Sequence, residues 1–175
     1  TDDGHVWHFE SLGARRTQPL DVGLEGTAPF HWDGDMEDLG VLMTEVLAHR
    51  MGGKQQSAER AASFDRWLFA QVRPPARSRR DDATLVAEGE ALFTQLDCVR
   101  CHDADGGAAS LTTPIRNVPL QVPSLRRVSL RPPFMHDGRS ATLEQAVVDM
   151  IETTTNVSAP ASHDVAAMTA YLRTL

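Results

Sequence analysis

The sequence predicts a mainly α-helical protein whose helices are joined by long ordered loops. Five segments place apolar residues three and four positions apart, which is the spacing of an amphipathic helix. Alternating strand patterns are weak, and residues 103–141 are rich in Gly, Pro, Ser and Thr, which predicts a loop. The predicted helices cover residues 35–51, 57–72, 82–96, 142–154 and 162–175.

The first two predicted helices lie before a proline-rich break. Asp35 is the predicted N-cap of the first helix, and Trp67 is expected in the core-facing side of the second. The break "RPPARSRRDDA", residues 73–83, suits neither helix nor strand and is predicted to link two units. The two apolar faces comprise Leu39, Leu42, Met43, Val46 and Leu47, and then Ala61, Phe64, Trp67, Leu68 and Val72.

The other three predicted helices follow the break. Residues 82–96 run directly into the only two cysteines of the chain. Residues 142–154 open with Thr142 and Gln145, the spacing of a capping box. The last helix is predicted to have Ser162 as its N-cap and to carry Met168 on its apolar stripe, so Met168 is expected in the core.

Composition and charge exclude several classes of function. The chain has 175 residues, 41% of them apolar, so it can form one domain or two small ones. The net charge is −7 and no basic stripe exists outside residues 73–80, so nucleic acid is not an expected partner. No apolar run reaches the roughly 20 residues of a membrane span. No signal peptide or initial Met is visible, so we expect a mature or trimmed form, and the oligomeric state stays open, a dimer included.

The chain contains an internal repeat with a shift of 104 residues. The segment "PFHWDGDMEDLGVLMTEVL" (29–47) aligns with "PFMHDGRSATLEQAVVDMI" (133–151). The repeat predicts two related units, 1–76 and 77–175. The counterpart of the cysteines would fall before Thr1, so the first unit is expected to be degenerate or truncated, without its own cysteine motif. Five identities lie within eleven positions: Pro29/Pro133, Phe30/Phe134, Asp33/Asp137, Gly34/Gly138 and Leu39/Leu143.

Residues 98–102, "CVRCH", carry the attachment signature of a c-type haem. Cys98 and Cys101 lie on one helical turn, so their thiols can form thioether bonds to the two vinyl groups of one porphyrin. His102 follows at once and is predicted to bind the haem iron from the proximal side. A redox-active disulfide, a structural disulfide or half of a zinc site fits less well, because the chain lacks the sheet context of the first and the further ligands of the last.

The residues alone leave the second axial ligand of the iron open. Met135 and His136 lie in a proline-rich loop ahead of an Asp-Gly turn, which can hold a ligand. Met150 lies on a predicted helix, where periodicity alone favours a core position. These three residues remain candidates. His163 is expected to be solvated at the start of its helix.

The run "VPSLRRVSLRPPFMHDGRSATLEQAVVDM", residues 122–150, resembles the C-terminal haem domain of bacterial di-haem cytochrome c peroxidases. The resemblance implies a cytochrome c-like helical haem domain. Its axial ligands would be His102 and Met150, and His136 would be a pocket residue next to the haem. The matching positions are Val122, Pro123, Ser124, Leu125, Arg126, Phe134, His136, Asp137, Gly138, Thr142, Leu143 and Met150.

The chain departs from that family in carrying one haem motif where the family has two. We therefore expect an electron-transfer domain with one covalent, His/Met-ligated haem c and a transient redox partner protein. The alternative is a peroxidase that reduces hydrogen peroxide with a second haem supplied by sequence upstream of Thr1. Catalytic residues stay unassigned, and a non-catalytic sensor module is a third reading without specific support.

Two further expectations come with this resemblance. In the family a tryptophan between the two domains carries electrons, and Trp7, Trp32 and Trp67 are the candidates here. Haem c attachment takes place outside the cytoplasmic membrane, so a bacterial periplasm or another extracytoplasmic location is expected.

Overall fold

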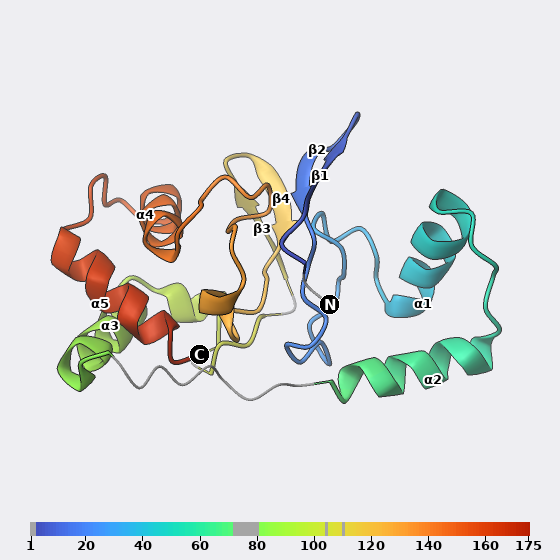
Figure 1. Ribbon diagram of the computed structural model, residues 1–175, viewed down its shortest axis with the longest axis horizontal. Helices are drawn as coiled ribbons and strands as arrows, with labels where there is room; N and C mark the ends of the chain where they lie inside the picture. The colour runs from blue at the N-terminus through green and yellow to red at the C-terminus, as the bar shows by residue number, and fades with distance from the viewer. Residues whose placement is uncertain (1–2, 72–80, 104, 110) are drawn as a thin grey trace.

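The computed structural model describes residues 3–71, 81–103, 105–109 and 111–175 (Figure 1). Two β-hairpins lie between two groups of helices, with α1 and α2 on one side and α3, α4 and α5 on the other. Most of the predicted linker, and the predicted boundary between residues 76 and 77, lie outside the described residues. The predicted mainly helical architecture is confirmed.

The helices of the second group begin close to their predicted positions. Asp82 caps the first of them through its Oδ1 atom, which accepts from the Thr84 amide at 2.7 Å. Thr142 and Gln145 form the predicted capping box. The predicted N-cap of the last helix is wrong by one residue, because the backbone turns at Ala161 and not at Ser162. The bounds are α3 Ala83–Gln95, α4 Leu143–Thr154 and α5 Ser162–Leu172.

The crossing of α3 and α5 defines the main core. Gly89 of α3 lies so close to α5 that an added Cβ would overlap the carbonyl oxygen of Ala167. Met168 is 3% exposed, which confirms its predicted core position. The buried cluster comprises Phe93, Phe134, Leu143, Ala146, Val147, Ile151, Val165, Met168, Tyr171, Leu172 and Leu175.

The first group of helices is smaller and more exposed. The predicted helix 35–51 starts later, at α1 Leu39–Leu42, and continues as the π-helix η1 Met43–Arg50. Its N-cap is Asp38, whose Oδ1 accepts from the Val41 amide at 2.8 Å, and not Asp35.

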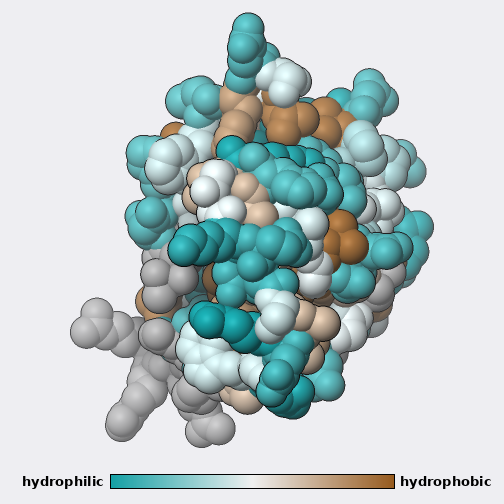
Figure 2. All heavy atoms as spheres, turned by 90° about the vertical axis from the view of Figure 1, so that its right-hand side faces the viewer, coloured by the Kyte–Doolittle hydropathy of each residue, from teal (hydrophilic) through white to brown (hydrophobic). Residues whose placement is uncertain are grey.

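The second helix of this group, α2 Ala58–Phe69, begins after its N-cap Ser57. The expectation that Trp67 is core is wrong, because this side chain is 58% exposed. Only Leu68 is buried on α2. Figure 2 shows this end of the molecule, where polar residues predominate and apolar ones form separate patches.

Two short antiparallel hairpins were not predicted. Strands β1 Val6–Phe9 and β2 Gly13–Arg16 pair with Val6 opposite Arg16. Strands β3 Thr112–Ile115 and β4 Val118–Gln121 pair with Ile115 opposite Val118. Their turn places Arg116 and Asn117 at φ 50° and 67°, as a two-residue hairpin turn requires.

Each hairpin contacts a turn from the opposite group of helices. The Arg16 amide of β2 donates to the His136 carbonyl at 2.7 Å, and the Gln121 amide of β4 donates to the Trp32 carbonyl at 2.9 Å. The two turns have the same local geometry: His31 and Met135 have φ of 71° and 70°. Isolated bridges join Phe30 to Met36 and Phe134 to Ser140, again 104 residues apart. The hairpins therefore tie residues from both halves of the chain into one structure.

Candidate cofactor site

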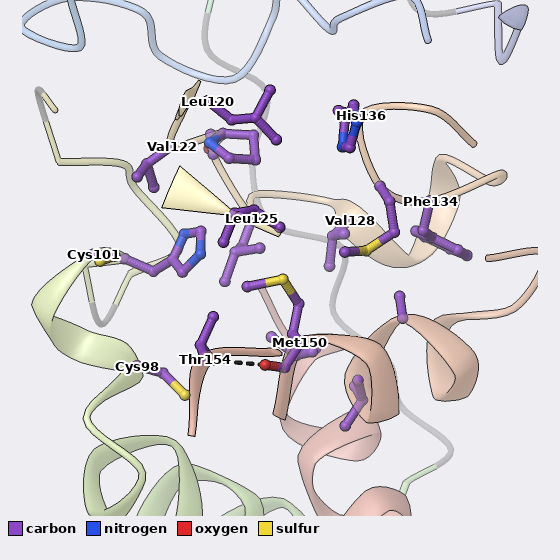
Figure 3. Close-up of a pocket in the computed structure, with 18 of the residues that line it drawn as sticks. Cys98, Cys101, Leu120, Val122, Leu125, Val128, Phe134, His136, Met150 and Thr154 are labelled. Carbon is purple, nitrogen blue, oxygen red and sulfur yellow. Dashed lines mark hydrogen bonds between the residues drawn. The ribbon is translucent and has the colours of Figure 1, made fainter. Parts of the chain in front are cut away.

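An apolar cavity of about 250 Å³ lies between the second helical group and the β3–β4 hairpin (Figure 3). Its walls come from α3, α4, α5 and the loop that contains the short 3₁₀ helix η3 Val128–Leu130. Arg16, Pro19 and Trp32 from the first half of the chain also line it. Sequence reasoning missed these three contributions. Two of them carried a signal, because Trp32 and Pro19 are the repeat counterparts of the cavity residues His136 and Pro123.

The cysteine motif forms the 3₁₀ helix η2 Cys98–Arg100 at one side of this cavity. Asp97 ends α3 in the left-handed conformation, with φ 60°, and so redirects the chain. The amides of Cys101 and His102 both donate to the Cys98 carbonyl, at 3.2 and 3.0 Å. This tight turn places both thiols and the imidazole at the cavity, as the motif predicts.

His102 is partly buried, with its Nδ1 shielded from solvent, and its chemistry suits binding of a metal ion by the neutral imidazole. Burial lowers its pKa to about 4, although the Pro123 carbonyl acts in the opposite direction. The ring Nδ1 is buried and has no hydrogen-bond partner among the described residues. At neutral pH the ring is therefore uncharged and has a nitrogen lone pair to offer.

Cys98 and Cys101 are free thiols, each partly buried. Burial raises the pKa of Cys98, and the nearby Asp97 carboxylate and Cys101 sulfur raise it further, so its thiol stays protonated at neutral pH. The described residues form no disulfide, and they gather no group of three His, Cys, Asp or Glu side chains that could hold a metal ion. Two thiols and an imidazole beside one apolar cavity are the groups that a thioether-bound haem requires.

All three candidates for the second axial ligand line the same cavity. Met150 reaches into it from α4, with the cysteines on one side and Phe134 and His136 on the other (Figure 3). It packs against the buried cluster of Trp32, Ile115 and Leu120. Thr154 Oγ1 donates to the Met150 carbonyl at 2.7 Å. Met135, by contrast, packs against the main core.

His136 lies at the cavity beside Trp32. The two rings meet edge to face, with centroids 6.3 Å apart. Burial lowers the pKa of His136, and Arg139 and Arg15 lower it further, while Asp137 and Asp33 act in the opposite direction. His136 is therefore a neutral, half-buried polar group at neutral pH, in keeping with the pocket role that the resemblance implies.

Next to Met150 on α4, Asp149 forms the centre of an ion-pair network. Its Oδ1 accepts from Arg116 at 2.6 Å and its Oδ2 accepts from Arg139 at 2.5 Å. Thr153 Oγ1 adds a third hydrogen bond at 3.2 Å. Burial alone would raise the pKa of Asp149, but the two guanidinium groups lower it below its usual value. The carboxylate is charged at neutral pH and joins α4 to two other segments.

Of the three tryptophans, only Trp32 lies at the cavity. Its ring is 9% exposed, and its Nε1 donates to the Arg16 carbonyl at 2.5 Å. Trp7 and Trp67 are exposed. His163 is also exposed, as expected, and contacts Glu88 at 2.9 Å.

A second, smaller cavity of about 70 Å³ is lined mostly by the first half of the chain, with Ala108, Gln121, Pro123 and Ser124 contributed by the second half. Its lining repeats part of the first lining at a shift of 104 residues. The matched pairs are Gln18/Val122, Pro19/Pro123, Leu20/Ser124, Leu24/Val128, Thr27/Arg131, Phe30/Phe134, His31/Met135, Leu39/Leu143 and Leu42/Ala146. No cysteine lines this second cavity.

A curated protein shares sequence with the chain. Cytochrome c551 peroxidase of Nitrosomonas europaea is 32% identical over 113 residues. That match covers 51% of this chain and 31% of the relative, so the chain matches about a third of the relative's length. The relative confirms the resemblance to cytochrome c peroxidases predicted from residues 122–150.

Two solved structures share the fold. The hydrazine synthase of Kuenenia stuttgartiensis superposes with a TM-score of 0.79 at 14% identity. A MauG-like protein associated with microbial copper homeostasis superposes with a TM-score of 0.68 at 15% identity. Each match covers 99% of this chain and 77% of the other.

The family profile described as Cytochrome c matches residues 86–175, just over half of the chain. The matched region includes the cysteine motif, the cavity walls from α3 to α5, and all three candidates for the second ligand. The predicted cytochrome c-like helical fold is therefore confirmed, and the chain belongs to the cytochrome c family.

Proposed function

We propose that this chain is a one-electron transfer domain that carries a single haem c. Cys98 and Cys101 attach the haem, and His102 and Met150 bind its iron. The observation that carries the proposal is the meeting, in one apolar cavity, of two free thiols, a partly buried neutral imidazole and a thioether from a separate helix. Membership of the cytochrome c family supports it.

Each residue has a definite chemical task in this proposal. The two thiols add across vinyl groups, with sulfur bonding to one carbon and the thiol hydrogen moving to the other, so attachment requires no oxidant. His102 supplies an uncharged nitrogen and Met150 a thioether sulfur, a ligand pair typical of electron-transfer cytochromes. Bound haem supplies reversible one-electron redox chemistry at its iron. The apolar cavity walls keep water out, which favours the less charged state of a redox centre.

Reduction of hydrogen peroxide within a longer protein is a second candidate function. The name of the N. europaea relative favours it, as does the place of Trp32 between the two halves of the chain. In this reading His102 and Met150 hold an electron-relay haem, and Trp32 lies on the path toward a second centre. Peroxide turnover by the full-length protein after reduction would favour this candidate over simple electron transfer.

We further propose that residues 1–76 and 77–175 are related units. The shared turn geometry and the matched cavity linings at a shift of 104 residues support this. An extracytoplasmic, periplasmic location and a transient redox partner also belong to the proposal, since they follow from haem c attachment. Among the described residues, no helix is long and apolar enough to cross a membrane.

The proposal is tested by counting covalently bound haem. Intact mass of the protein produced with haem-attachment machinery should exceed the chain mass by one haem, and the haem should stay bound after acid denaturation. Cys98→Ser with Cys101→Ser should abolish this retention. Redox titration of the haem-loaded wild-type protein should give one reversible one-electron wave. Haem that is lost on denaturation of the wild-type protein would refute covalent attachment.

A further inference from the structure

We propose that Asp149 is a positioning residue that holds Met150 in place for binding the haem iron. This inference rests on the proposed function, because it concerns the placement of a proposed ligand. Asp149 does not reach the cavity: it precedes Met150 on α4 and is absent from the cavity lining. It acts through the segments that it ties together.

Asp149 joins three segments that form the cavity wall. Arg116 comes from the β3–β4 turn, Arg139 comes from the turn after His136, and Asp149 itself belongs to α4. Both guanidinium groups contact the carboxylate at 2.6 Å or less, in the range of charge-assisted hydrogen bonds. Arg139 is held in turn by Asp137, at 3.0 Å. The side chains of Asp149 and Arg139 are 10% and 23% exposed, so solvent screens their ion pair weakly. The pair with Arg116 is screened more, because the Arg116 side chain is 59% exposed.

The ion pair between Arg116 and Asp149 lies next to the residues that pack against Met150. Ile115, next to Arg116, belongs to the cluster of Trp32, Ile115 and Leu120 against which Met150 packs. The ion pair therefore fixes the distance between the helix that carries Met150 and the hairpin that supports its side chain. Loss of the ion pair would let α4 move relative to β3–β4.

The ion pair between Arg139 and Asp149 connects α4 to the turn that bears Met135 and His136. These residues are the other two candidates for the same face of the haem. The same carboxylate thus links the turn that bears Met135 and His136 to the helix that bears Met150. Partners that orient a metal ligand commonly change metal affinity or activity about 10–100-fold when they are removed.

The test is Asp149→Asn in the haem-loaded protein, with Glu152→Gln as the matched control. Glu152 is an exposed acid on the same helix, so its variant has the same charge change. In Asp149→Asn we expect a weaker sulfur-to-iron absorption band in the oxidised protein and a lower reduction potential. We also expect free imidazole to bind the iron about tenfold more tightly or more. Glu152→Gln should match the wild-type protein in all three measurements.

Partial variants separate positioning from general stability. Arg116→Gln and Arg139→Gln should each give part of the effect, and Asp149→Glu should recover part of it. Arg116 is well exposed at the surface, so its variant is expected to fold even if Asp149→Asn does not. A wild-type-like absorption band and imidazole affinity in Arg116→Gln, and in any Asp149→Asn that folds, would overturn the inference. Absence of the sulfur band from the wild-type protein would instead refute Met150 as the ligand.

Discussion

At the scale of residues, Asp105 determines how the chain leaves the cysteine motif. Its carboxylate accepts from Arg126 at 2.6 Å and from the Gly107 amide at 3.0 Å. Arg126 also donates to the Val22 carbonyl at 3.1 Å. Through Arg126, Asp105 therefore joins the loop after His102 to the run that resembles the peroxidases. Arg126 in turn contacts the first half of the chain.

These contacts predict how acid affects the stability contributed by Asp105. The hydrogen bond from Arg126, followed by that from Gly107, lowers the pKa of Asp105 below 3.8. Its contribution is therefore present above pH 3.8 and is lost as the pH falls through the lower folded-state pKa. Urea unfolding of Asp105→Asn should show reduced stability at pH 7 and convergence with wild type in stronger acid. Asp103→Asn, on the same loop, is the control, and a constant difference at every pH would contradict this account.

The residues at the site were predictable to different degrees. Cys98, Cys101 and His102 were identified because their chemistry depends on spacing within one turn of the chain. Met150 required a family resemblance, since its periodicity on α4 is that of a core residue. Arg16 could not be predicted, because its position at the cavity depends on a hairpin that crosses to the other half of the molecule.

At the scale of elements, the amphipathic helices were predicted well and the hairpins were missed. Helices extend over several turns, so their periodicity and caps can be read from sequence. The strands of β3 and β4 are four residues long and each contains a proline, Pro114 or Pro119, which obscured the strand pattern. Trp67 was assigned to the core because its helix is amphipathic, yet its side chain is 58% exposed, while Leu68 on the same predicted face is buried.

At the crossing of α3 and α5, helix propensity and close packing have opposite effects on the stability of a Gly89→Ala variant. Helix propensity alone predicts that Gly89→Ala stabilises the protein by about 1 kcal/mol. The new methyl group would overlap the Ala167 carbonyl, so we expect destabilisation by about 3 kcal/mol or more. Chemical denaturation measures the change. Ala87→Gly, at an exposed position of α3, should cost about 1 kcal/mol, and a more stable Gly89→Ala would contradict the packing.

At the scale of the whole molecule, the two halves of the chain are joined because the hairpin of each half contacts a turn of the other half. Trp32 lies at this junction, with its carbonyl bound by Gln121, its Nε1 bound to Arg16 and its ring against His136. The cavity wall therefore includes residues from both halves. The cysteine motif alone could not have predicted this, because it describes only the local attachment point.

From its place at this junction, we expect Trp32 to contribute to the free energy of unfolding. Trp32→Phe keeps an aromatic ring but removes the buried hydrogen bond to Arg16, and we expect a loss of about 1–3 kcal/mol in unfolding free energy. Trp67→Phe is the control, and because Trp67 is exposed its change should lie within about 0.5 kcal/mol. Thermal and urea unfolding give both values. Equal effects of the two substitutions would show that the junction adds nothing to stability.

The absorption spectrum of the oxidised protein shows whether His102 and Met150 together bind the iron of one haem. A thioether ligand gives a weak long-wavelength sulfur-to-iron band. We predict that the wild-type protein and Met135→Leu show this band at neutral pH and that Met150→Leu lacks it. A band that survives in Met150→Leu but disappears in Met135→Leu would assign the ligand to Met135. Its absence from the wild-type protein would contradict methionine ligation altogether.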